Sequence, residues 1–170
     1  MAGLTLQIFN IPTKIVLDEF LLDATIKAVG HLDDSLNNEE YDYLNVSDVV
    51  ATPWRQDNPV KPIAYPTGVL KTEDVFMVYP VETDVQEGIK RLHNFERIVF
   101  YLQHFIIHGS LSMGAEMNLQ GAMEAMPRRF LVATDVSLFP MFPARAAMPE
   151  VMPIVLLNRA LVSHYHTAAD

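Results

Sequence analysis

Four histidines stand in two close pairs, and they are the residues whose type and spacing best suit chemistry. His104 and His108 are separated by three residues, and His164 and His166 by one. On a strand, these even spacings place both side chains of a pair on one face. The first and last strands of a closed barrel can be neighbours, so the four imidazoles could converge and bind Zn²⁺, Ni²⁺ or Cu²⁺. The spacing makes His104, His108, His164 and His166 a candidate metal site, although a surface or interface cluster of histidines is the favoured interpretation.

Other signatures of catalysis are missing from the sequence. There is no glycine-rich nucleotide-binding loop, no nucleophile elbow, no metalloprotease motif and no cysteine. The acidic pair Asp33-Asp34 is typical of a solvated loop. Asp48 and Asp135 each follow a hydroxyl residue and are interpreted as structural residues at strand ends. We therefore expect no enzymatic activity, no catalytic residues and no cofactor.

The composition favours a protein that contacts other proteins. Half of the 170 residues are apolar, and the mean hydropathy is +0.15. No apolar run reaches the roughly 18 residues of a membrane span, and the N-terminus does not resemble a signal peptide. An apolar surplus without a span indicates surface that is buried against a partner. With a net charge of −9 and no cysteine, we expect a cytoplasmic protein that does not bind nucleic acid.

Three blocks of sequence recur in the same order and indicate an internal duplication. The segment 20–26 resembles 105–111 at an offset of 85, and 43–49 resembles 130–136 at an offset of 87. A third match, at an offset of 86, places Val69-Leu70 over Val155-Leu156. We expect two repeats, residues 1–82 and 92–170, joined by a linker.

Each repeat has the pattern of a small β domain. Phe20, Leu22, Ala24 and Ile26 alternate with polar residues, as in a strand with one buried face. A short turn or helix follows this strand in each copy, at 32–38 and at 117–126. Further expected elements are a strand at 43–52, a proline-rich connection at 53–66, and a hairpin-like pair around 69–70 and 75–79.

These patterns resemble the small, partly open Sm-like and SH3-like β-barrels. The closer resemblance is to an uncharacterised bacterial family of such domains, carried by the turn Asp33-Asp34-Ser35-Leu36-Asn37 and by the strands 43–49 and 130–136. This resemblance implies a mainly β fold of two tandem small barrels with short helical turns. It implies no activity, and the acidic composition departs from the RNA binding found among Sm-like proteins.

The two repeats differ in charge and in methionine content. Residues 1–87 carry 5 basic and 15 acidic side chains, a net charge of −10, whereas residues 88–170 carry 7 and 6, a net charge of +1. Seven of the nine methionines lie in the second repeat, and flexible thioethers suit contact surfaces as well as irregular cores. We expect the second repeat to meet a partner or to pack on the first; the candidate interface residues are Phe100, Leu102, Ile106, Met117, Met123, Met126, Met148 and Met152.

The sequence therefore favours a non-catalytic structural or scaffolding subunit that joins a larger protein assembly mainly through its second repeat. The partner would be another protein or further copies of the chain, and peripheral attachment through a membrane complex stays open. The alternative is a sensor that binds a small ligand or a metal at His104, His108, His164 and His166.

Overall fold

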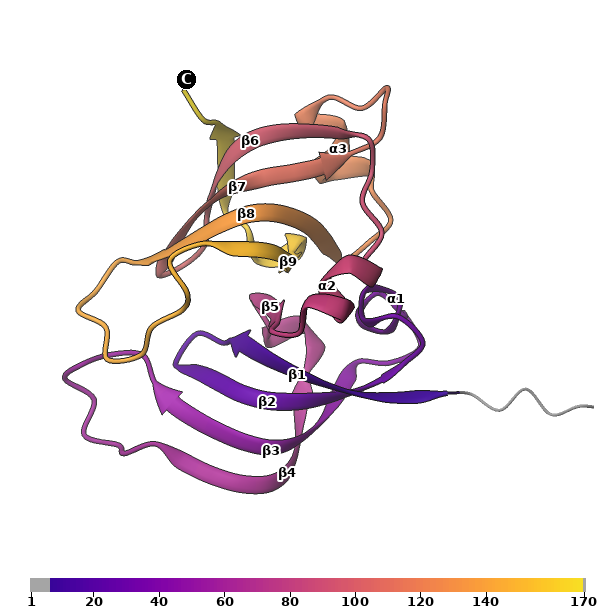
Figure 1. Cartoon of the computed structure of the whole chain (residues 1–170). Coiled ribbons are helices and arrows are strands. Elements are labelled where there is room, and N and C mark those ends of the chain that lie inside the picture. Colours follow the sequence, from indigo (N-terminus) through magenta and orange to yellow (C-terminus); the bar gives the residue numbers. More distant parts are fainter. Residues whose placement is uncertain (1–6, 170) are drawn as a thin grey trace, which may run out of the picture.

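The computed structural model describes residues 7–169, and its chain is mainly β (Figure 1). The first half of the chain holds five strands, two short helices and one 3₁₀ turn. In chain order they are β1 (Ile8–Val16), β2 (Phe20–Val29), α1 (Leu32–Leu36), β3 (Tyr43–Pro53), β4 (Ile63–Lys71), the 3₁₀ turn Thr72–Asp74, β5 (Met77–Pro80) and α2 (Thr83–Gly88).

The second half repeats this order of elements, without a counterpart of α2. Its elements are β6 (Asn94–Tyr101), β7 (Phe105–Met113), α3 (Leu119–Ala125), β8 (Phe130–Pro140), β9 (Met152–Asn158), the 3₁₀ turn Arg159–Leu161 and β10 (His164–Thr167). The expected short helix appears in both halves, as α1 and as α3.

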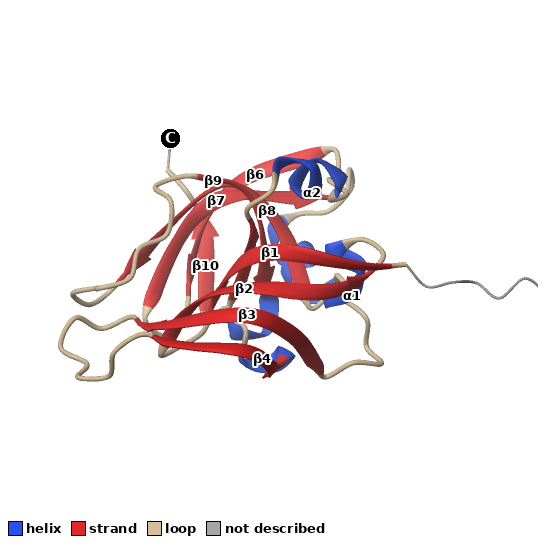
Figure 2. Ribbon diagram, turned by 60° about the horizontal axis from the view of Figure 1, so that its bottom comes forward, coloured by secondary structure: helices blue, strands red, loops and turns tan. Residues whose placement is uncertain are grey.

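All ten strands form one antiparallel sheet in the order β10-β6-β7-β8-β9-β5-β1-β2-β3-β4. Within each half the order is the same, with the fifth strand beside the first and the fourth strand at the far side. The halves join where β5 pairs with β9. The sheet is not closed: among residues 7–169, β4 and β10 are each paired along one side, and β4 is visible as one border of the sheet in Figure 2.

A β-bulge occupies the same position in each half. Opposite β2 the register of β3 shifts around Asp48, and opposite β7 the register of β8 shifts around Asp135. Both aspartates have φ of 51°, in the left-handed region. They therefore lie within strands rather than at strand ends, and the extra residue bends each strand.

The strand registers define which residues of the two halves are equivalent. Tyr43 lies opposite Lys71, and Phe130 lies opposite Asn158, so β3, β4 and β5 correspond to β8, β9 and β10 at an offset of 87. The strands β1 and β2 correspond to β6 and β7 at an offset of 85. The third sequence match is thus one residue out of register, because Val69 is equivalent to Leu156 rather than to Val155.

The expected hairpin between residues 69–70 and 75–79 is wrong. β4 pairs with β3, and β5 crosses to lie between β1 and β9. The 3₁₀ turn Thr72–Asp74 separates the two strands and redirects the chain. All four residues of β5 are buried, so the apolar character of 75–79 reflects burial on both faces of the sheet and not one arm of a hairpin.

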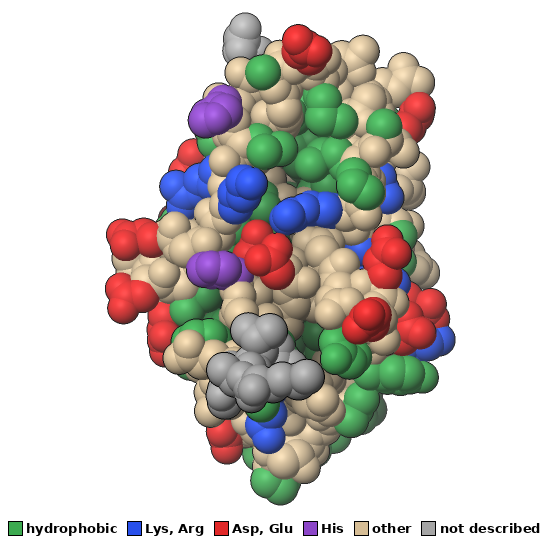
Figure 3. Space-filling model, turned by 90° about the vertical axis from the view of Figure 1, so that its right-hand side faces the viewer, with side chains coloured by type: hydrophobic (Ala, Val, Ile, Leu, Met, Phe, Trp, Pro, Cys, Tyr) green, Lys and Arg blue, Asp and Glu red, His purple; other side chains and the backbone are tan. Residues whose placement is uncertain are grey.

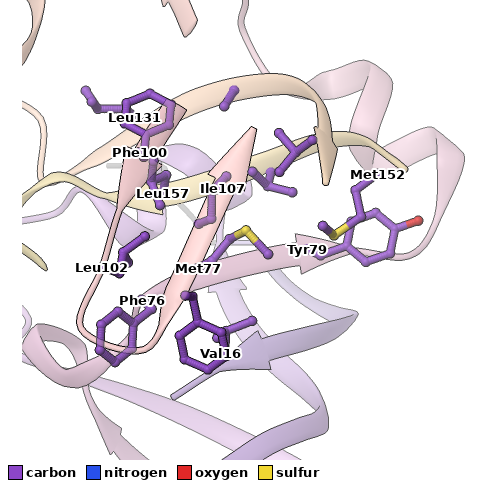
Figure 4. Close-up of a cluster of buried hydrophobic side chains, with 14 of the residues drawn as sticks. Val16, Phe76, Met77, Tyr79, Phe100, Leu102, Ile107, Leu131, Met152 and Leu157 are labelled. Carbon is purple, nitrogen blue, oxygen red and sulfur yellow. The ribbon is translucent and has the colours of Figure 1, made fainter. Parts of the chain in front are cut away.

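Two hydrophobic clusters make up the core, and each draws on both halves of the chain. Around the second half, one cluster also includes Leu21 and Trp54 of the first half, together with Val16, Phe76, Met77 and Tyr79, which are labelled in Figure 4. Around the first half, the other also includes Phe130, Val132, Ile154 and Leu156 of the second half. Successive residues of β9 thus point into different clusters, and the central strands tie the halves together.

Within the described part of the chain, no helix combines the length and apolarity that crossing a membrane requires.

Candidate functional site

Two of the four histidines lie on β10, beside a tyrosine of the neighbouring strand. The ring of His164 stacks on the ring of Tyr101, with their centroids 4.0 Å apart, because the register of β10 and β6 places the two residues opposite each other. His166 contacts the same tyrosine, and its Nε2 lies 3.1 Å from the Tyr101 hydroxyl oxygen. Both imidazoles are exposed, so this edge of the sheet presents an accessible aromatic cluster.

The other two histidines have different neighbours. His104 lies in the turn between β6 and β7, with its Nε2 3.7 Å from Asp18 Oδ1. His108 lies on β7, where the edge of its ring meets Phe139 at a centroid distance of 5.2 Å. Across the sheet, His108 and His166 flank Val99 from the two adjacent strands, a separation of about 10 Å between their backbones.

This arrangement does not gather the four imidazoles at one point. A shared Zn²⁺ would need each ligating nitrogen about 2.1 Å from the ion. Within residues 7–169, no three histidine, aspartate or glutamate side chains are grouped so that they could hold a metal ion. Metal binding at His104, His108, His164 and His166 stays a prediction without geometric support.

The histidines do belong to an exposed face of the second half, which we call the histidine face. Opposite residues of an antiparallel sheet point to the same side, and the strand registers align two rows across β10, β6, β7 and β8. Phe139, at the end of one row, is 48 % exposed. The histidine face consists of Tyr101, Ile106, His108, Phe139, His164 and His166.

Most of the candidate interface residues lie in the core of the second half or against it. Phe100, Leu102, Met123 and Met152 are buried there. The partly buried residues Met117, Met126 and Met148 pack against the same core. Of the eight candidates only Ile106 belongs to the histidine face, so a partner docking on that face would contact Ile106 and five residues outside the candidate set.

The misplacement of Phe100 and Leu102 has a simple cause. On one continuous strand, residues 100, 102 and 106 would all lie on the same face, because their positions have the same parity. The turn between β6 and β7 interrupts that strand, and the register places Phe100 opposite Ile107, a core residue. The turn reverses the parity, and Phe100 therefore points inward.

A groove that the sequence did not indicate opens on the first half, beside α1 and α2. It has a volume of about 810 Å³ and is lined by side chains that include Phe9, Val29, His31, Glu82 and Val85. Figure 3 views this side of the molecule, where charged side chains of both signs intermingle below an apolar area near α3. Phe9 and Val29 are exposed apolar residues of this lining, and the sequence did not single them out because apolar residues on a surface are common.

Ion pairs connect the acidic first half to the second half. Arg128 Nη1 lies 3.5 Å from Asp33 Oδ2, and Arg129 Nη2 lies 3.9 Å from Asp42 Oδ1. The Asp33 side chain is 2 % exposed, so Arg128 compensates a charge that has little access to water. The expected solvated loop is therefore wrong: both aspartates lie in α1, and only Asp34 is exposed, whereas Asp33 belongs to the contact between the halves.

The two borders of the sheet carry side chains that are accessible to solvent, and on β4 these include large apolar ones. On β4, Ile63 is 48 % exposed and Val69 is 62 % exposed. On β10, none of the four residues is buried. Strand edges of this kind offer unpaired backbone groups to another strand. Sequence patterns did not reveal these borders, because Val69-Leu70 reads like any buried strand.

The comparisons with protein families, with curated proteins and with solved structures find no match to this chain. Its functional assignment therefore depends on the surfaces described above. They offer aromatic, apolar and imidazole groups for contact with another molecule.

Proposed function

We propose that this protein is a non-catalytic structural subunit that joins a larger protein assembly, in the cytoplasm, mainly through the second half of its chain. The observation that carries the proposal is the histidine face. It presents Phe139 at 48 % exposure, together with the half-buried Tyr101 and Ile106. Aromatic side chains of this kind dominate the energetics of protein interfaces.

The charge distribution supports the same assignment. The first half, with a net charge of −10, repels other acidic surfaces, whereas the second half, at +1, does not. A partner can therefore approach the second half without a large electrostatic penalty. Nucleic acid is a poor fit for either half, because phosphate binding needs clustered basic side chains.

We further propose that the two halves are duplicated copies of one small barrel-like domain, with boundaries near residues 1–82 and 92–170. The repeated order of elements, the paired bulges and the identical φ of Asp48 and Asp135 support this interpretation. The fused sheet modifies it, because each copy completes the core of the other.

The test is co-purification from the native source with full-length chain and matched variants. We expect Ile106→Ser with Phe139→Ser to lose the partners that the unmodified chain retains. Val50→Ser is the control, because Val50 is 40 % exposed and is equivalent in the first half to Ser137, which lies opposite His108. Equal partner retention by both variants would rule out the histidine face as the contact surface.

A further inference from the structure

The junction between the two halves joins strands of different type. β5 is the fifth strand of the first half, and β9 is the fourth strand of the second. Met77 lies opposite Leu157 and Val78 opposite Leu156. The backbone N–H of Asn158 donates to the carbonyl of Phe76 across the same junction.

The two borders of the sheet are the counterparts of the two junction strands: β4 is equivalent to β9, and β10 is equivalent to β5. β4 is the fourth strand of the first half, and β10 is the fifth strand of the second. We propose that β10 of one copy pairs with β4 of a second copy, so that chains assemble head to tail by repeating the β5–β9 junction between molecules. This inference rests on the proposed function, whose partner it identifies as the chain itself.

Burial on the β4 side supports this proposal. Phe130 and Leu156 are fully buried at the internal junction, whereas their equivalents Tyr43 and Val69 are 57 % and 62 % exposed. Both positions carry large side chains with much apolar surface, although solvent reaches them. Docking of a second copy would remove that apolar area from water, which favours association.

Four further positions show the same contrast in a milder form. In the second half the side chains at four positions are at most 2 % exposed, in a cluster that residues of the first half share: Leu102, Phe105, Met152 and Leu157. Their equivalents in the first half are only partly buried against their own core: Leu17, Phe20, Tyr65 and Leu70. The first half thus keeps an apolar docking surface that its own chain leaves incompletely covered.

The second half carries the complementary surface. Val16, Leu21 and Trp54 reach from the first half into the core of the second. Their equivalents are Tyr101, Ile106 and Met141, and Met141 is 53 % exposed where Trp54 is 1 % exposed. The repeated junction would therefore bury Tyr101 and Ile106 of the histidine face, together with Met141 beside it.

The equivalence of the halves also fixes the register of the proposed pairing. Met77 and Val78 correspond to His164 and Tyr165, and Leu157 and Leu156 correspond to Leu70 and Val69. His164 should therefore lie opposite Leu70, and Tyr165 opposite Val69. The four residues of β10 would then face 67–70 of β4, and the pairing would end just before Pro66, which has no N–H to donate.

Charge favours this unlike pairing over a symmetric one. Pairing two β4 strands would bring together two halves that each carry a net charge of −10. Pairing β4 with β10 brings the acidic half against a half at +1 instead. Like-charge repulsion thus disfavours the symmetric dimer and favours the head-to-tail contact.

Engineered disulfides test the register directly, because the chain has no cysteine. In the repeated junction Val69 and Tyr165 form a hydrogen-bonded pair, for which the Cα–Cα distance is about 5.5 Å, within disulfide range. Mixing Val69→Cys chains with Tyr165→Cys chains under mild oxidation should give a covalent dimer. Neither variant should give one alone, and Val50→Cys mixed with Tyr165→Cys should not.

Sedimentation velocity of the full chain provides the second test. We expect the unmodified chain to form species larger than a monomer as concentration rises. Val69→Pro should shift it to monomer, because it removes the N–H that faces the open edge and spares the pairing with β3. Val69→Thr keeps that N–H and should retain assembly, which makes it the matched control.

Two outcomes overturn the proposal. One is a covalent dimer from Val69→Cys alone, which would indicate symmetric pairing. The other is a monomer at all concentrations with no disulfide in the mixture. If the Ile106→Ser with Phe139→Ser chain still loses a co-purified protein in that second case, the proposed function stands and only the identity of the partner fails.

Discussion

Asp48 and Asp135 show how single residues set the curvature of this sheet. Both have φ of 51°, a conformation that costs an ordinary L-residue roughly 1–2 kcal/mol and that aspartate tolerates better than most. Both side chains are exposed. The backbone conformation, rather than a side-chain contact, therefore explains why the same residue recurs.

We expect Asp135→Gly to leave the free energy of unfolding unchanged or to raise it slightly, since glycine adopts positive φ freely. Asp135→Val should lower it by about 1–2 kcal/mol, because a β-branched side chain is strained in this region. Urea denaturation of both variants checks this, with Asp48 as the internal replicate. Equal effects of glycine and valine would contradict the backbone explanation.

The ion pair between Lys71 and Glu73, at the end of β4, should make the stability of the fold depend on pH. Their side chains form an exposed ion pair. The hydrogen bond and the charge of Glu73 raise the pKa of Lys71, and the same contacts with Lys71 lower the pKa of Glu73. The ion pair stabilises the folded state at pH values between the pKa of Glu73 and the pKa of Lys71, where both side chains are charged. It is lost as the pH falls through the folded-state pKa of Glu73 or rises through that of Lys71.

An NMR titration of the Glu73 carboxyl carbon checks the direction. Replacing Lys71 with methionine should raise the pKa of Glu73, and added salt should reduce the difference between the two proteins, because exposed pairs are screened. An unchanged midpoint in Lys71→Met would show that the pair does not persist in solution.

At the scale of elements, α1 matters because it holds a buried carboxylate against the second half. Removing Arg128 leaves the Asp33 charge uncompensated, and we expect Arg128→Ala to destabilise the fold by about 1–3 kcal/mol, a value between those of exposed and buried pairs. In the Asp33→Asn background the same change should cost much less. A double-mutant cycle by urea denaturation measures the difference, and additive effects would contradict a direct ion pair.

The elements that the sequence predicts best are those with one buried face. The alternation of Phe20, Leu22, Ala24 and Ile26 predicts β2 correctly, and the helix expected within 117–126 is α3. β5 and β9 were harder, because a strand buried on both faces has no alternation. The sequence does not show that Phe100 points into the core, because the turn between β6 and β7 changes which positions, odd or even, face inward on the two strands.

The candidate site was predicted only in part. The sequence identified the four histidines as a candidate site. The structure places them on the second half, but it does not bring them together, because they have different neighbours. Which strands form the borders of a sheet depends on pairings between distant segments, and no local pattern in β4 or β10 encodes them. The exposure of Val69 could therefore not be foreseen, since its neighbours along the chain resemble those of the buried Leu156.

At the scale of the whole molecule, the two halves should unfold together. Trp54, the only tryptophan, belongs to the first half but is buried in the core of the second. The centroids of its ring and the Phe105 ring are 5.1 Å apart. β5 and β9 contribute to both clusters. Neither core can be lost without uncovering apolar surface in the other, which makes an all-or-none transition the expected behaviour.

The prediction is that Trp54 fluorescence and far-UV circular dichroism report one urea transition with the same midpoint. Ile26→Ala in the first-half core and Ile107→Ala in the second-half core should each cost about 2–5 kcal/mol. Because the cores are coupled, each change should move both signals together. If Ile26→Ala shifted the dichroism midpoint and left the Trp54 midpoint in place, the halves would be independent domains. A shared transition would instead show that the β5–β9 junction is part of one cooperative core.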